Sequence, residues 1–222
     1  MKVKICGLTR IEDVKSCENL GVHSLGFINI KRSKRFLKID EINNLIDSAK
    51  LNSHVRTVAV LEPKSCHELE IKIKKLKVDS IQLHSLSCTE IMEFKEKNRD
   101  CTIIRAVGLS DKLDYNKKKQ IKDFAKICDC ILLDYELLGK TGGNGIQIPI
   151  DIAVDASKIA RKSNKDIELF IAGGIDLERV RTEGYILNKY FDYLDLNSGV
   201  EEKPGIKNHN KITEILRYIA NY

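Results

Sequence analysis

Short apolar runs alternate with longer polar segments along the whole chain, and this alternation predicts its secondary structure. Eight apolar runs have the length and β-rich composition of strands, and they occupy residues 3–6, 24–28, 57–61, 80–84, 103–107, 130–134, 168–172 and 193–197. Polar segments with helical spacing follow them, at residues 11–20, 40–49, 65–76, 89–97, 114–127, 152–161, 177–183 and 211–220. The pattern predicts a strand followed by a helix, repeated eight times.

Strands that alternate with helices form βαβ units with parallel strands and right-handed crossovers. Such units either spread into an open, doubly wound sheet or close into a barrel. A dinucleotide-binding sheet is disfavoured, because no G-x-G-x-x-G sequence follows the first run. The chain has 222 residues and shows no internal linker or change in composition. The sequence therefore predicts one α/β domain over residues 1–222, a compact (β/α)8 TIM barrel.

The composition indicates a folded chain outside membranes. Hydrophobic residues make up 42% of the chain, enough for a substantial core. Its apolar runs fall short of the roughly 18 residues that a membrane span needs, and the segment after Met1 lacks the apolar stretch of a signal peptide. The seven cysteines are odd in number and show no C-x-x-C spacing, which disfavours a disulfide framework and a zinc site. We therefore expect a cytoplasmic protein with free thiols and no membrane partner.

The net charge is +6, from 38 basic and 32 acidic residues. Much of the excess lies in lysine clusters at residues 72–77 and 117–119, which we interpret as solvated helix faces. Aromatic residues do not interleave these clusters, so nucleic-acid binding is not supported. A mildly positive field favours a small anionic substrate.

In a (β/α)8 barrel the active site lies at the C-terminal ends of the strands, the mouth of the barrel. The residues at the predicted strand ends include a thiol, a carboxylate, several cations and two glycine-rich turns. They are Cys6, residues 31–35, His84, Arg105, Asp134, Gly173, Gly174, Asn197, Ser198 and Gly199. The two turns follow the last two strands, where barrels commonly bind phosphate through backbone N–H groups. The alternative, that they only turn the chain, is disfavoured by their occurrence at both strands.

Cys6 and Asp134 are the candidates for proton transfer. Cysteine is most often a small buried hydrophobe, but at a strand end facing a basic mouth we expect a lowered thiol pKa and a thiolate that acts as base or nucleophile. Asp134 ends a very apolar run, which favours a raised pKa and a role as acid; the alternative is a helix cap or an ion-pair partner. A base and an acid that face each other across the mouth suit proton transfer.

Two further side chains have alternative interpretations. Arg35 ends the basic segment at residues 31–35, which is either a solvated charge run or the source of a guanidinium fork for a substrate carboxylate. His84 either hydrogen-bonds the ligand or supports the mouth.

Several short motifs resemble those of phosphoribosylanthranilate isomerase, a family of the tryptophan pathway. They span the whole chain in the family's order, and the first and last are the most specific. They are KICGLTR at 4–10, GFI at 26–28, SKR at 33–35, QLH at 82–84, RAVG at 105–108, LLD at 132–134, GGNG at 142–145, AGG at 172–174, NSGVE at 197–201 and PG at 204–205.

The resemblance implies a barrel that converts N-(5-phosphoribosyl)anthranilate to 1-(2-carboxyphenylamino)-1-deoxyribulose 5-phosphate, an Amadori rearrangement without cofactor or metal. It makes Cys6 the base that takes the C2′ proton and Asp134 the acid that protonates the ring oxygen. A monomer and a homodimer both fit this fold. Residues that the resemblance places at the phosphosugar substrate are Arg35, His84, Gly143, Gly173, Gly174, Asn197, Ser198 and Gly199.

The chain departs from the family pattern at two places. Many members carry Phe-Asp-Trp after the glycine loop, whereas residues 146–151 read IQIPID, with Asp151 as the candidate for the aspartate. Tyr135 follows Asp134 where a small residue is common. Both departures bear on the substrate range.

Two other functions compete with this interpretation. The sister isomerase of histidine biosynthesis acts on a larger aminoaldose with two phosphates, and uses aspartate where Cys6 stands; a dual-specificity enzyme is a variant of this alternative. A non-catalytic phosphosugar-binding barrel belongs to another class, but a pure binder has no need for both Cys6 and Asp134.

Overall fold

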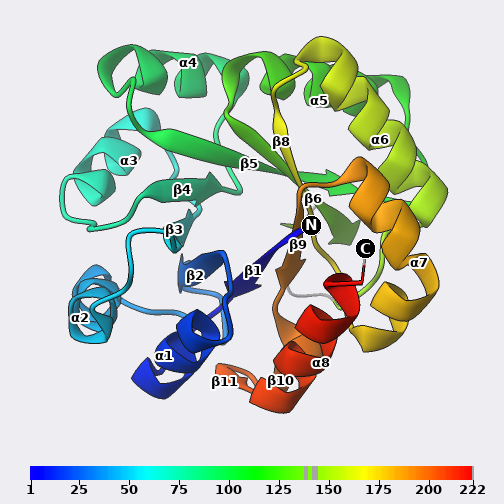
Figure 1. The fold of residues 1–222 in the computed structure, drawn as a ribbon. Helices are drawn as coiled ribbons and strands as arrows, with labels where there is room; N and C mark the ends of the chain where they lie inside the picture. The colour runs from blue at the N-terminus through cyan, green and yellow to red at the C-terminus, as the bar shows by residue number, and fades with distance from the viewer. Residues whose placement is uncertain (138–139, 142–144, 222) are drawn as a thin grey trace.

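Eight parallel strands close into a barrel in the computed structural model, which describes residues 1–137, 140–141 and 145–221 (Figure 1). Each strand pairs with its neighbours along the chain, and the β1–β9 and β5–β6 pairings complete the circle. The barrel strands are β1 (Lys2–Cys6), β2 (Ser24–Asn29), β3 (Arg56–Leu61), β4 (Ser80–Leu83), β5 (Thr102–Leu109), β6 (Cys130–Leu137), β8 (Glu168–Ile171) and β9 (Tyr193–Leu196). The predicted (β/α)8 fold and its eight strands are confirmed.

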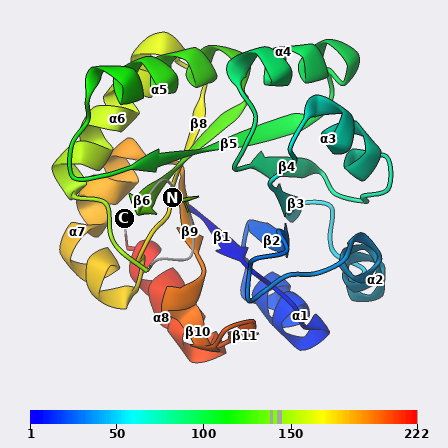
Figure 2. The same ribbon diagram turned by 180° about the vertical axis from the view of Figure 1, so that it is seen from behind.

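Eight helices surround the strands, and α8 lies beside α1 so that the ring is complete (Figures 1 and 2). They are α1 (Ile11–Asn19), α2 (Ile39–Ala49), α3 (Cys66–Ile73), α4 (Cys88–Lys97), α5 (Tyr115–Ile127), α6 (Ile150–Ser163), α7 (Leu177–Tyr190) and α8 (His209–Ile219). Side-chain caps begin five of them, from Ser65, Ser87, Asp114, Asp176 and Asn208. No described helix is long and apolar enough to cross a membrane.

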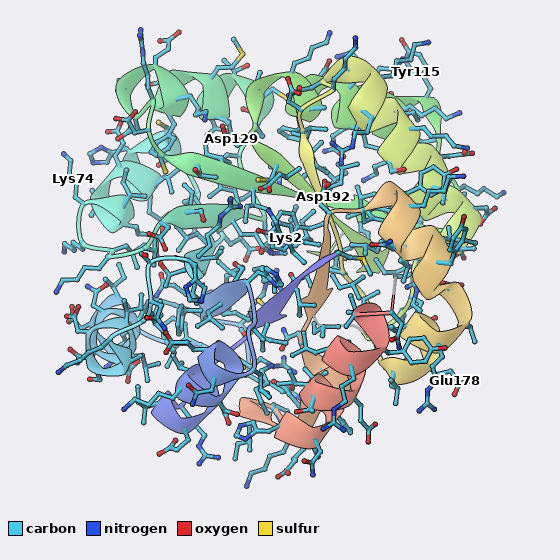
Figure 3. The ribbon with its side chains drawn as sticks, in the orientation of Figure 1. Lys2, Lys74, Tyr115, Asp129, Glu178 and Asp192 are labelled. Carbon is cyan, nitrogen blue, oxygen red and sulfur yellow. The ribbon has the colours of Figure 1, made fainter. Side chains whose placement is uncertain are left out.

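The helix predicted at residues 177–183 continues to Tyr190. Gly184 lies buried inside α7, which therefore continues past the predicted end at residue 183. The lysines predicted to be solvated are mostly exposed, and Figure 3 shows Lys74 at the outer edge of the ring while Lys2 lies near its centre. Lys117 is partly buried and pairs with Glu136 at 2.9 Å.

The barrel interior is filled by an apolar layer below the mouth. Phe170 and Tyr193 stack in this layer with ring centroids 4.1 Å apart, and Leu132 packs with them. Because side chains two residues apart on a strand share a face, the inward positions continue toward the mouth as Asp134 after Leu132 and as Asp195 after Tyr193. The mouth therefore combines polar side chains with an apolar floor.

Two short antiparallel hairpins lie at the mouth of the barrel. The end of β6 pairs with β7 (Lys140–Thr141) in antiparallel fashion. After β9 come a 3-10 turn (Ser198–Val200) and the antiparallel pair β10 (Glu201–Lys203) and β11 (Ile206–Lys207). This second hairpin carries two charged side chains, Glu201 and Lys207, that are buried at the mouth.

Candidate active site

Nine of the ten residues that the family resemblance places in the site line one cleft of about 350 Å³ at the C-terminal ends of the strands. Its size lies in the range typical of small-molecule sites. The nine are Cys6, Arg35, His84, Asp134, Gly173, Gly174, Asn197, Ser198 and Gly199. Gly143, the tenth, lies outside the described residues. The barrel thus brings together residues that are far apart in the sequence.

The Cys6 thiol ends β1 and is 5% exposed. It packs against Gly26 of β2, where an added Cβ would lie 3.0 Å from Sγ. Burial raises the pKa of Cys6, and the charge of nearby Lys4 opposes this shift without overcoming it. The expectation of a lowered thiol pKa is therefore wrong, because the loss of hydration outweighs the basic surroundings.

A buried polar network lies beneath Cys6. The Lys4 ammonium, fully buried, donates to Asp195 Oδ2 at 2.8 Å and to Gln82 Oε1 at 2.9 Å. Since the Gln82 oxygen accepts from Lys4, its amide nitrogen donates to His84 Nε2, 3.0 Å away, which puts the imidazole proton on Nδ1. Burial and the charge of Arg105 lower the pKa of His84 to about 4. His84 is therefore neutral at pH 7, and it lines the cleft.

Asp134 lies inward at the end of β6 and is 8% exposed. Burial, reinforced by the charge of Asp195, raises the pKa of Asp134 to about 7, although the Tyr135 backbone N–H donates to Oδ1 at 2.8 Å. The raised pKa predicted from the apolar run is confirmed. At neutral pH a large fraction of this carboxyl group carries a proton that it can donate.

Arg35 lies over the mouth, with its guanidinium fork already engaged. Nε donates to Glu201 Oε1 at 2.8 Å and Nη2 to Oε2 at 2.5 Å, and Lys207 donates to the same carboxylate at 2.8 Å. Arg35 crosses Gly7, whose φ is +73° and where an added Cβ would lie 2.4 Å from Arg35 Cδ. The fork predicted for a substrate carboxylate therefore holds Glu201, and the cluster of Arg35, Lys207 and Glu201 keeps one net positive charge.

The two glycine-rich turns meet at the cleft, where the segments after β8 and β9 come together. Gly173 and Gly174 both have left-handed backbones, with φ of +79° and +59°, a conformation that favours glycine. A Cβ on Gly174 would lie 2.7 Å from the Gly145 carbonyl oxygen, and a Cβ on Gly199 would lie 2.1 Å from that of Ile175. Backbone therefore packs directly on backbone, and the turns border the cleft without side chains at these positions.

The comparisons with known proteins agree along the whole chain. A sequence model of N-(5′-phosphoribosyl)anthranilate isomerase matches residues 3–218. The chain belongs to this family. Relatives of that name from Methanothermobacter thermautotrophicus and Clostridium kluyveri are each 34% identical to it, and the matches cover 98% and 100% of this chain and 88% and 98% of theirs. As a member of the phosphoribosylanthranilate isomerase family, the chain is an isomerase.

Solved structures of phosphoribosylanthranilate isomerases share the fold. The Thermus thermophilus structure has a TM-score of 0.79 and 25% identity, and the match covers 100% of this chain and 99% of that one. The Thermotoga maritima structure has a TM-score of 0.81 and 22% identity, with full coverage of both chains.

The two departures from the phosphoribosylanthranilate isomerase pattern have defined places. Asp151 lies exposed in the first turn of α6, two residues after Pro149 at the N-cap. The Tyr135 hydroxyl donates to Asp111 Oδ1 at 3.2 Å, and its side chain leaves β6 on the face opposite Asp134. Tyr135 thus packs on the loop after β5 while its backbone holds the candidate acid.

Arg105 was predicted at the mouth, and the structure contradicts this. Its Nη1 donates to the Leu83 and Ala106 carbonyl oxygens at 2.8 and 2.6 Å, and its guanidinium lies over the Phe124 ring of α5. Ala106 occupies the inward position of β5, so Arg105 points outward between strand and helix. It fixes the end of β4 from outside the barrel.

Lys4, Gln82 and Asp195 were missed by the sequence interpretation. Each precedes a predicted mouth residue by two positions, namely Cys6, His84 and Asn197. The period of two along a strand is the signal that could have found them. Glu201 and Lys207 lie outside this strand period, because a hairpin brings them to the mouth, although Glu201 is the last residue of the NSGVE motif. Among the described residues, no group of three His, Cys, Asp or Glu side chains could hold a metal ion.

Proposed function

We propose that Asp134 and Cys6 carry out the isomerisation of N-(5′-phosphoribosyl)anthranilate in this cleft, as acid and base. The observation that carries the proposal is the pair itself: a carboxyl group with a pKa raised to about 7 and a thiol beside a buried ammonium line one cleft. Two groups whose surroundings give them different proton affinities suit a reaction that both donates and removes a proton. A protein that only bound this substrate would not need the two groups, because asparagine at position 134 and serine at position 6 would be equally compatible with binding.

The first step opens the sugar ring. Asp134 gives its proton to the furanose oxygen as the C1′–O bond breaks, and the lone pair of the anthranilate nitrogen forms the C1′ iminium. The carboxylate that remains is buried near Asp195, but the ammonium of Lys4 also interacts with it. The positive charge that develops on the substrate further compensates the new carboxylate.

The second step removes the C2′ proton, which the adjacent iminium has made acidic. The Cys6 thiolate takes this proton, and the electron pair of the C–H bond forms the C1′–C2′ double bond of an enolamine, which tautomerises to the aminoketose. Lys4 stabilises the thiolate because its ammonium interacts directly with Cys6. The protonated Asp134 and the ionised Cys6 are therefore required in the same molecule.

The two anionic ends of the substrate match the two sides of the cleft. The phosphate fits the bare backbone around Gly173 and Gly174 and around Ser198 and Gly199. The carboxylate fits the side of Arg35, where two cations and the single carboxylate of Glu201 leave one positive charge. Binding at both ends fixes the sugar between acid and base.

Turnover by the purified protein tests the proposed function directly. We expect it to consume phosphoribosylanthranilate, followed as loss of the substrate's fluorescence, and to leave the two-phosphate aminoaldose of the sister reaction unchanged. The Cys6→Asp variant is an informative comparison, because the sister family carries aspartate at this position. Activity of the wild type on the aminoaldose alone would reverse the assignment.

The pH dependence of kcat/KM is expected to be bell-shaped. The active form needs Cys6 ionised and Asp134 protonated, but the Cys6 pKa is the higher of the two. The rate therefore rises with pH up to about 7, the Asp134 pKa, stays level, and falls once pH exceeds the raised Cys6 pKa. Asp195→Asn removes a charge that raises the Asp134 pKa, so the low-pH limb should move to lower pH.

The same substrate is used for both proteins, so its own ionisations cancel from this comparison. A low-pH limb that stays in place in the Asp195→Asn variant would contradict the assignment of that limb to Asp134.

A further inference from the structure

The first turn of α7 holds a buried arginine that neither step of the reaction uses. Arg179 is 2% exposed, and its three donor nitrogens reach three different acceptors. Nη1 donates to the Gly173 carbonyl oxygen at 3.2 Å, Nη2 to that of Ile148 at 2.7 Å, and Nε to Glu183 Oε2 at 2.8 Å. The planar fork of a guanidinium suits donation to several fixed acceptors at once.

The two carbonyl groups belong to different loops that meet at the cleft. Gly173 starts the turn after β8, and Ile148 lies in the segment before α6. These loops also touch on the side of the cleft: Gln147 Nε2 donates to the Gly174 carbonyl oxygen at 2.9 Å, and a Cβ on Gly173 would lie 2.8 Å from the Ile146 oxygen. The two loops are therefore joined by two side chains, the buried Arg179 and the exposed Gln147.

The position of the Gly173 turn affects both ends of the chemistry. Gly174 faces Gly145 across the loop contact, and a Cβ on Gly173 would lie 2.9 Å from Asp134 Oδ1. A shift of this turn would move the backbone that is proposed to bind the phosphate, and it would change the packing against the Asp134 carboxyl group. Loss of Arg179 would therefore weaken substrate binding even though Arg179 does not contact the substrate.

We propose that Arg179 is a positioning residue that sets the spacing of the phosphate-binding loops. This inference rests on the proposed function, in which the Gly173–Gly174 turn receives the substrate phosphate. Glu183, whose side chain is 28% exposed, balances the charge, so the fork is free to hold two neutral carbonyl groups. Lysine keeps the charge but cannot donate in one plane to three acceptors. Methionine keeps the apolar stem and loses every donor.

Arg179→Met and Arg179→Lys test the proposal, with Arg56→Met as the matched control. Arg56 pairs with Glu168 at 2.8 Å at the start of β3, the opposite end of the barrel from the cleft. We expect Arg179→Met to raise KM, and the inhibition constant of inorganic phosphate, each between about tenfold and 100-fold. Arg179→Lys should fall between wild type and Arg179→Met, and Arg56→Met should leave both constants within about twofold.

Inorganic phosphate reports on the loops separately from the reaction. If the wild type binds phosphate without turning over the substrate, the proposed reaction fails, and weaker phosphate binding by Arg179→Met still supports the positioning role. Unchanged KM and phosphate inhibition in either folded Arg179 variant would overturn the proposal. Equal losses in Arg56→Met would also overturn it, because the effect would then be one of general stability. If Arg179→Met does not fold, KM and the phosphate inhibition constant of Arg179→Lys decide the test.

Discussion

Asp134→Asn and Cys6→Ser are each expected to lower kcat by about 10²–10⁴, the usual contribution of a group that transfers a proton. Asparagine has no proton to give to the ring oxygen, and a serine hydroxyl is a far weaker base than a thiolate. Binding should change less, because the anchors at the two ends of the substrate remain. The measurement is steady-state kinetics with phosphoribosylanthranilate, and turnover at the wild-type rate in Asp134→Asn would refute the role of the acid.

A stability measurement separates catalytic loss from misfolding. The folded pKa of Asp134, about 7, lies above its ordinary value of 3.8, so the folded state favours the protonated form. The free energy of unfolding therefore falls as pH rises from about 4 to 7, and the carboxylate then costs at most about 4 kcal/mol. Asp134→Asn should consequently be more stable than wild type at pH 8, with the difference shrinking at pH 4. Thermal unfolding at the two pH values measures it.

Lys4→Met is expected to destabilise the protein by about 3–5 kcal/mol at pH 8, because it leaves the buried Asp195 carboxylate without its cation. The two side chains are 0% and 6% exposed and 2.8 Å apart. The loss should be smaller at low pH, where Asp195 takes up a proton, and the double variant Lys4→Met/Asp195→Asn should recover much of it. Denaturant unfolding monitors the change.

Lys2→Met on the same strand is the matched control. Lys2 is half exposed and lies 3.5 Å from Glu168, so its removal should change the free energy of unfolding by less than about 1 kcal/mol. Equal losses in the Lys2 and Lys4 variants would show that the buried network has no special weight.

The barrel could be predicted because each strand is a separate apolar run and each helix a separate polar segment. The raised pKa of Asp134 followed from the apolar residues that precede it in the same strand. Local sequence suffices in such cases, since the neighbours that decide the outcome are neighbours along the chain. The extension of α7 through Gly184 was missed for the converse reason, because its packing partners lie elsewhere.

The charge balance of the mouth could not be predicted in this way. The pKa of Cys6 depends on Lys4, Asp195 and Lys207 and on the depth of burial, which only the closed barrel determines. Arg35 was recognised as a mouth residue, but its partner Glu201 lies 166 positions away. Arg105 was misplaced because it lies in the middle of β5, whose end is Leu109, and because the outward direction of its side chain was not considered.

The pairing of β1 with β9 has a consequence for how the chain is built. One edge of β1 stays unpaired until β9, the eighth barrel strand, which lies almost 190 residues further along the chain, pairs with it. Unpaired strand edges invite association between chains, and charged side chains on such strands counter it. Lys4 lies at the centre of β1, and its ammonium reaches Asp195 only when β9 pairs with β1. The buried network beside the candidate base is therefore complete only once the last barrel strand has paired with the first.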